Sequence, residues 1–206
     1  VLDAGQADAI GFARAFVADA HWVAKAAVDT PERLRPCIGL NQGCRAFAPH
    51  LHCAVNPHAG RENDPRFDTG TAHISHPRKV AIIGGGPAGL EAACTAAARG
   101  HKVTLYEASG GLGGQFLYPA SIPGGGELSR LIDHLRGEAM RLGVSIRLNH
   151  RVHGIDDLAG PADVVILATG AQPQPLPAHL DPQTAIGGLD ILRDGAPEPP
   201  GSGHAL

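Results

Sequence analysis

The sequence predicts an α/β fold in which helices cover a parallel sheet. Three observations lead to this prediction. From Lys79 onward, short apolar runs typical of buried strands alternate with helical patterns, which is the order found in parallel sheets. The glycine pattern G-x-G-x-x-G lies directly between the first apolar run and the first helical pattern. An acidic residue, Glu107, ends the second apolar run.

Two less regular regions precede this alternation. Residues 1 to about 30 predict a short helix, a strand around Ala9 to Phe12 and a second helix through Trp22 and Lys25. From about Pro36 to Pro77 the sequence is rich in Pro, Asn, His and Gly and lacks sustained periodicity. Such a long irregular segment inside a compact protein usually serves a ligand or a function.

The later elements are strands and helices in turn. In the first helix proline occupies the first turn and Gly100 lies just beyond the end, and in the second helix apolar residues recur at helical spacing. We expect mostly loop after Gly170. The predicted strands are Val80 to Ile83, Lys102 to Glu107, Val144 to Leu148 and Asp163 to Ala168, and the predicted helices are Pro87 to Arg99 and Glu127 to Leu142.

The composition excludes several classes of protein. With 17 Lys and Arg against 20 Asp and Glu, the chain lacks the basic excess that binding to nucleic acid requires. It has neither an apolar run of about 20 residues nor a signal peptide, so we expect no membrane association and a cytoplasmic location. The only methionine is Met140, and the end of the chain is rich in Pro and Gly. We therefore expect the chain to be part of a longer protein.

The glycine pattern has a direct physical interpretation. Gly84 permits a tight turn, Gly86 lacks the side chain that would block a pyrophosphate, and Gly89 lets the helix lie close to the strand. Phosphates would then lie against free N–H groups at the N-terminus of the helix. Glu107 is placed to accept hydrogen bonds from ribose hydroxyls and to disfavour a 2′-phosphate. Together these features predict a Rossmann-type site for a nucleotide.

Two later segments make the interpretation more specific. GGLGGQF follows Glu107, and VVILATGAQP places Thr169 and Gly170 after a late strand. With the glycine turn, these segments resemble the flavoproteins that have two dinucleotide-binding domains. In that superfamily the first glycine turn holds the ADP part of FAD. The resemblance spans about Lys79 to Pro173.

The cysteine-containing segment points to one family. RPCIGLNQGCRAFAPHLHCAVNPHAGRE resembles the iron-sulfur segment of the multidomain Old Yellow Enzyme relatives, of the 2,4-dienoyl-CoA reductase and trimethylamine dehydrogenase type. In that family an FMN-binding TIM barrel precedes a 4Fe-4S segment, and nucleotide-binding domains follow. The first 30 residues look like the last strand and helix of the barrel. The resemblance implies that Arg14 contacts the FMN phosphate and that Cys37, Cys44 and Cys53 are metal ligands. Cys94, in an alanine-rich helix, is expected to pack as a small apolar side chain.

The cysteine pattern departs from that of the family at one position. The second cysteine should fall at position 40, where this chain has Leu40, and leucine cannot ligate iron. Thiolates are the usual ligands of iron-sulfur clusters. Three cysteines leave several outcomes open: a 4Fe-4S cluster with an outside ligand or with His50 or His52, a 3Fe-4S cluster, or a loop without metal.

The resemblance also implies contacts with FAD. The matching positions are Ala88 in the glycine turn, Glu107 at the ribose, Gln115 in GGQF, and Val152 in the strand-like NHRV stretch. Gly125 falls where some relatives have a lysine.

Four regions follow from these resemblances: the end of an FMN-binding barrel, the cysteine segment with a linker, an FAD- or ADP-binding Rossmann domain, and an incomplete connection toward an NAD(P)H domain. Their expected bounds are residues 1–35, 36–77, 78–175 and 176–206.

The implied parent enzyme moves electrons between NAD(P)H, FAD, an iron-sulfur cluster and FMN, and acts on enoyl, dienoyl or amine substrates. We nominate no catalytic acid or base, and we expect residues 1–206 to be inactive alone. Two alternatives stay open. The chain could belong to a glutamate-synthase-like or disulfide-reductase-like flavoprotein, or it could be a non-catalytic ADP-binding domain.

Overall fold

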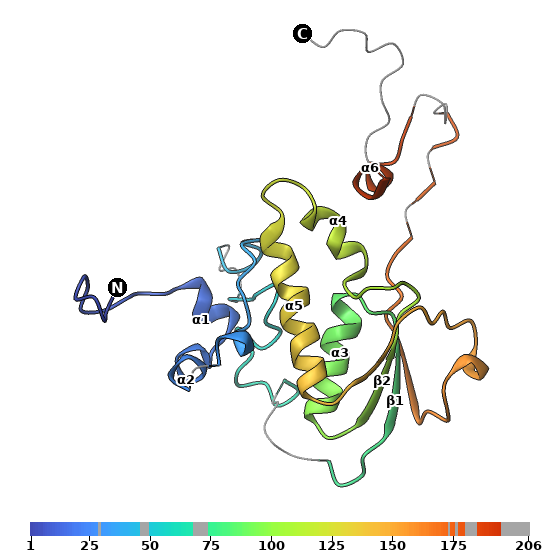
Figure 1. Ribbon diagram of the computed structural model, residues 1–206, viewed down its shortest axis with the longest axis horizontal. Coiled ribbons are helices and arrows are strands. Elements are labelled where there is room, and N and C mark those ends of the chain that lie inside the picture. Colours follow the sequence, from blue (N-terminus) through green and yellow to red (C-terminus); the bar gives the residue numbers. More distant parts are fainter. Residues whose placement is uncertain are drawn as a thin grey trace.

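The described residues contain a parallel sheet of four strands in the order β3-β2-β1-β4, which lies beside the helices at the lower right of Figure 1. The structure is a computed structural model that describes residues 1–28, 30–45, 50–67, 74–172, 174–175, 177–179 and 185–194. The strands are β1 (Lys79–Ile83), β2 (Lys102–Tyr106), β3 (Ser145–Arg147) and β4 (Val164–Leu167). The predicted α/β class with a parallel sheet is therefore confirmed.

Two long helices cover one face of this sheet. They are α3 (Pro87–Ala98) and α5 (Gly126–Arg141), which pack against each other, and α3 also packs on β1 and β2. The largest fully buried side chains between these layers are Ile82, Leu90, Leu105 and Leu135. Cys94 is also buried there and its Sγ donates to the carbonyl oxygen of Leu135 at 3.5 Å. Burial raises the pKa of this thiol to about 12, so Cys94 packs as an uncharged group, as predicted.

The predicted strands and helices of this region all occur, with ends that differ by at most one residue. Two short helices were not predicted, α4 (Leu117–Ala120) and α6 (Gly188–Asp194). Helices this short contain too few apolar repeats to give a periodic signal. None of the helices that the structure describes is both long and apolar enough to cross a bilayer.

The N-terminal region differs from the prediction. It contains α1 (Arg14–Ala18) and α2 (Trp22–Ala27), but residues 1–8 form turns and bends rather than a helix, and residues 9–12 do not form the predicted strand. A strand needs the main-chain groups of a neighbouring strand, and the described sheet offers residues 9–12 none. The NHRV stretch is also not a strand, because β3 ends at Arg147 and Asn149 turns the chain with a φ of 53°.

A buried carboxylate ties the N-terminal region together. Asp19 accepts hydrogen bonds from Nζ of Lys25 at 2.6 Å and from the backbone N–H of Arg35 at 2.9 Å. The Arg35 guanidinium then pairs with both carboxylate oxygens of Glu91 on α3, at 2.9 and 3.1 Å. Bidentate pairs of this kind fix geometry as well as adding energy. The start of the cysteine segment is thereby fastened to the first helix of the sheet.

The Asp19 cluster predicts acid sensitivity. Burial opposes ionisation of this carboxyl, but Lys25 and the N–H groups of Arg35 and His21 outweigh burial and lower its pKa. Asp19 therefore stabilises the fold above its unfolded pKa of about 3.9, and this stabilisation is lost as pH falls through the lower, folded pKa. We expect Asp19→Asn to reduce the free energy of unfolding by about 2 kcal/mol at neutral pH.

Urea unfolding of both proteins between about pH 3 and pH 7 measures this effect. The variant should lose less stability on acidification than the parent. Asp133→Asn is the matched control, because Asp133 forms an exposed pair with Arg136 and should change stability by less than about 0.5 kcal/mol. Equal acid sensitivity in the parent and Asp19→Asn would contradict the prediction.

Candidate functional site

The glycine turn joins the carboxyl end of β1 to the start of α3. Gly84 has a φ of +111°, and its N–H donates to the carbonyl oxygen of Tyr106 on β2 at 2.8 Å. A Cβ at Gly84 would lie 2.2 Å from the carbonyl oxygen of Ala168. A Cβ at Gly89 would lie 1.9 Å from the carbonyl oxygen of Gly84. The fold itself therefore requires glycine at positions 84 and 89.

Gly86 differs from these two glycines. Its φ is −74°, which any residue can adopt, and a Cβ there would have a single neighbour within 4 Å, the carbonyl oxygen of Gly113 at 4.0 Å. Gly86 is the N-cap of α3, and no side chain caps the helix, so the N–H groups of Ala88 and Gly89 in the first turn have no helical acceptor. The open space at Gly86 and the N–H groups beside it form a place for an anion.

Glu107 lies against the same turn. Its Oε2 accepts a hydrogen bond from the N–H of Gly85 at 2.7 Å, and its Oε1 accepts from both the N–H and the hydroxyl of Ser109 at 2.8 Å. Partial burial opposes ionisation, but these donors outweigh it and lower the pKa of the carboxyl. Glu107 is therefore an anion near neutral pH, and its oxygens keep lone pairs for ribose hydroxyls.

Ser109 and the N–H of Gly85 were not singled out from the sequence. A serine two residues after a carboxylate is a signal that could have identified Ser109, because short polar side chains bond to nearby main chain in this way.

The second glycine cluster and the Ala-Thr-Gly segment also reach the turn. The N–H of Gly113 donates to the carbonyl oxygen of Gly85 at 2.8 Å, and a Cβ at Gly114 would lie 3.3 Å from Cα of Gly86. Nε2 of Gln115 donates to the carbonyl oxygen of Ala171, just after Gly170. The structure thus brings Gly84, Gly86, Gly89, Glu107, Gln115 and Gly170 to one edge of the sheet.

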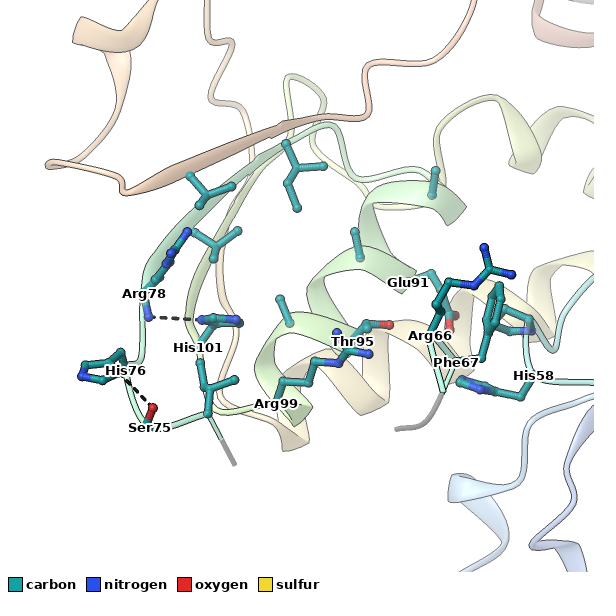
Figure 2. Close-up of a pocket in the computed structure, with 18 residues that line it drawn as sticks. His58, Arg66, Phe67, Ser75, His76, Arg78, Glu91, Thr95, Arg99 and His101 are labelled. Carbon is teal, nitrogen blue, oxygen red and sulfur yellow. Dashed lines mark hydrogen bonds between the residues drawn. The ribbon is translucent and has the colours of Figure 1, made fainter. Parts of the chain in front are cut away.

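Three other predicted residues line cavities beside β4. Thr169 and Val152 line a cavity of about 200 Å³ that also contains Val165. Ala88 lines a larger cavity that contains Ile166, and residues 165 and 166 point to opposite faces of the sheet. The Ala88 side chain lines that larger cavity, which Figure 2 shows, and not the glycine turn. The part of Ala88 that a nucleotide in the turn could contact is therefore its main-chain N–H, in the first turn of α3.

The predicted FMN and metal ligands lie in the N-terminal region. Arg14 and Cys37 line a common cavity of about 520 Å³, and Nη1 of Arg14 donates to Oδ1 of Asn41 at 3.2 Å. Cys37 and Cys53 are half-buried against the apolar core. Among the residues that the structure describes, no three His, Cys, Asp or Glu side chains are grouped to hold a metal ion. In this arrangement the three cysteines, Cys37, Cys44 and Cys53, do not fit an iron-sulfur cluster. A bound cluster stays a prediction from the sequence.

Known proteins with similar sequences and structures carry the same segment. Residues 78–195 match the family described as pyridine nucleotide-disulphide oxidoreductase. The chain is 39% identical over 180 residues to a metal reductase of Desulforamulus reducens, covering 84% of this chain and 26% of that protein. It is 38% identical over 169 residues to a multifunctional alkene reductase/demethylase, OYE, of Caballeronia cordobensis, covering 82% and 24%.

The same segment is found in a solved structure. A 2-naphthoyl-CoA reductase in complex with 2-naphthoyl-CoA superposes with a TM-score of 0.86 at 29% identity, covering 95% of this chain and 30% of that one. This chain spans about a quarter of the length of the metal reductase and of the alkene reductase/demethylase.

Proposed function

Because the chain belongs to the pyridine nucleotide-disulphide oxidoreductase family, we propose that the glycine turn of residues 84–89 binds FAD through its ADP part. The predicted resemblance to the Old Yellow Enzyme relatives is confirmed by the similarity to the alkene reductase/demethylase and to the metal reductase. Oxidoreductases of this kind use their cofactors for the redox chemistry, and the protein binds and orients them.

The observation that carries the proposal is the open space at Gly86. The turn around it is closely packed, yet position 86 alone has room for a side chain and contains none. A pyrophosphate there would meet the N–H groups of Ala88 and Gly89 and the positive end of the α3 dipole. The fold thus gives no reason for glycine at this position, whereas a phosphate does.

Glu107 supplies the second contact. Its carboxylate is held by Gly85 and Ser109, so it is oriented before a ligand arrives. It would accept hydrogen bonds from the ribose hydroxyls of the adenosine part and repel a 2′-phosphate. Bound FAD would supply the transfer of hydride and electrons, while these residues hold its ADP part at the edge of the sheet.

We further propose that this segment serves a longer flavin-dependent oxidoreductase that draws on NAD(P)H and FMN. The named relatives reduce metals, alkenes or an aromatic acyl-CoA, or remove methyl groups. Enoyl, dienoyl or amine substrates are the corresponding proposal for the parent of this chain. We derive no step through an iron-sulfur cluster, because the three cysteines do not form a metal site here.

Calorimetric titration with FAD, ADP and 2′-phospho-ADP tests the site. We expect FAD and ADP to bind at least about tenfold more tightly than 2′-phospho-ADP, and Glu107→Gln to weaken this preference. The matched control is Glu127→Gln, whose carboxylate is exposed on α5 and pairs with Arg130. Binding of ADP without any binding of FAD would contradict the flavin proposal and favour the non-catalytic ADP-binding alternative.

A further inference from the structure

A polar cavity of about 490 Å³ lies between the chain that precedes Cys37 and the helix α5. One wall is the short 3-10 turn η1 (Pro31–Arg33), which packs against α5. The other wall is one face of α5, formed at helical spacing by residues 130, 133, 134, 137, 138 and 141. None of the residues that line this cavity belongs to the glycine turn of residues 84–89, so the two places are separate.

The cavity contains a buried histidine that lacks one hydrogen bond. His134 is 8% exposed, and among the described residues its Nδ1 has no hydrogen-bond partner. Burial lowers the pKa of His134 and the charge of Arg35 lowers it further, so the ring is neutral near neutral pH. The main chain of Glu32 accepts a hydrogen bond from the ring. Because Nδ1 has no partner, Nε2 makes this bond, and Nδ1 keeps a lone pair for a donor.

A buried guanidinium donor lies at the same cavity. Nε of Arg33 has no hydrogen-bond partner in the described part of the chain, and Oε1 of Glu138 is 3.8 Å from it. This distance is too long for a hydrogen bond. Both oxygens of Glu138 instead accept from Arg141, at 2.7 to 3.1 Å. A buried charged donor without an acceptor is rare in folded proteins, which points to an acceptor that binds in the cavity.

The two unpaired atoms specify the hydrogen bonding of a ligand. Arg33 needs an oxygen that accepts, and His134 needs a group that donates. Arg130 and Arg141 also line the cavity. Among the described residues, Arg130 bonds through Nη1 and Arg141 through Nε and Nη2, which leaves guanidinium N–H groups for an anion. Hydrogen phosphate offers several acceptor oxygens and one O–H, whereas sulfate and carboxylates offer acceptors only.

We propose that this cavity between η1 and α5 binds free hydrogen phosphate, which accepts from Nε of Arg33 and donates its O–H to Nδ1 of His134. The guanidinium groups of Arg130 and Arg141 balance its charge. Since Arg33 belongs to η1 and His134 to α5, the bound anion joins the chain before Cys37 to α5. The proposal does not depend on flavin binding.

Calorimetric titration of the parent with phosphate, sulfate and glycerol phosphate at about pH 8 tests the proposal. Each of these anions carries about two negative charges at this pH, and hydrogen phosphate alone keeps an O–H on phosphorus. We expect hydrogen phosphate to bind at least about tenfold more tightly than the other two, because only its O–H satisfies Nδ1 of His134.

Two variants test the two contacts. His134→Phe keeps a ring and removes the unpaired nitrogen, so the protein should stay folded and bind phosphate and sulfate within about twofold of each other. Arg33→Gln should weaken phosphate binding at least about tenfold. The matched control is Arg147→Gln, at an exposed position on β3 outside the cavity, which should bind phosphate like the parent. Urea unfolding verifies that each variant is folded.

Gly86→Ala separates this proposal from the proposed flavin site, because it should bind phosphate in the cavity like the parent. Loss of phosphate binding in Gly86→Ala would overturn the proposal, since the anion would then occupy the glycine turn. The proposal would also be overturned by no phosphate binding to the parent, by equal affinity for phosphate and sulfate, or by parent-like binding in Arg33→Gln. A preference for phosphate that survives in His134→Phe would overturn it as well.

Discussion

Replacing Gly86 by alanine is expected to abolish dinucleotide binding while the protein stays folded. The added Cβ would meet no protein atom closer than the carbonyl oxygen of Gly113 at 4.0 Å, and the φ of −74° suits alanine. The methyl group would instead occupy the space proposed for the pyrophosphate. We expect at least about a 100-fold loss of FAD affinity, and a loss of folding stability below about 1 kcal/mol from the poorer N-cap.

Calorimetric titration and urea unfolding measure the two quantities on the same sample. Gly126→Ala is the matched control, because a Cβ at Gly126 meets nothing within 4 Å and lies at the start of a different helix, α5. The control should bind FAD like the parent. Parent-like FAD binding by Gly86→Ala would place the pyrophosphate elsewhere and contradict the proposed site.

Replacing Gly89 by alanine should have the opposite consequence, a large loss of folding stability. Its Cβ would lie 1.9 Å from the carbonyl oxygen of Gly84 and 3.4 Å from Cβ of Ala168. Both contacts are with parts of the sheet edge that cannot move independently, so α3 must shift away from β1. We expect a decrease of about 3 kcal/mol in the free energy of unfolding, the upper range of overpacking effects.

The control for this prediction is Gly137→Ala in the middle of α5. There a Cβ meets nothing within 4 Å, so alanine should raise stability by about 0.5 to 1 kcal/mol through its better helix propensity. Urea unfolding compares the two variants with the parent. A Gly89→Ala variant as stable as the parent would mean that the close approach of α3 to the turn is not required.

The Rossmann region was predictable because its signals are local. Apolar strand runs, Pro87 at a helix start and Gly100 beyond its end each specify structure within a few residues, and the elements end within one residue of the prediction. The strand expected at residues 9–12 depended on a partner strand elsewhere, and no local pattern contains that partner. Its absence from the described sheet is the physical reason that the prediction was wrong.

The residues of the candidate site were predictable from the sequence. The groups that hold those residues in position were less predictable. Gly84, Gly86, Gly89 and Glu107 carry distinctive types at fixed spacing, and they meet at one edge of the sheet. The N–H of Gly85 donates a hydrogen bond to Glu107. Because every residue except proline has a main-chain N–H, the type of residue at position 85 does not predict this contact. The arrangement of the three cysteines was also not predictable from the sequence. Their spacing suggests metal ligands, but the path of the loop between them decides whether the three sulfur atoms lie close together.

The ion pair between Arg35 and Glu91 fixes the position of the cysteine segment relative to α3. Glu91 lies in the second turn of the helix whose first turn would hold the pyrophosphate, and Arg35 lies two residues before Cys37. Any sliding of the cysteine segment relative to α3 must first separate a doubly hydrogen-bonded pair. The start of the cysteine segment is therefore held at a constant distance from the proposed nucleotide site, and these two parts of the chain keep one relative position.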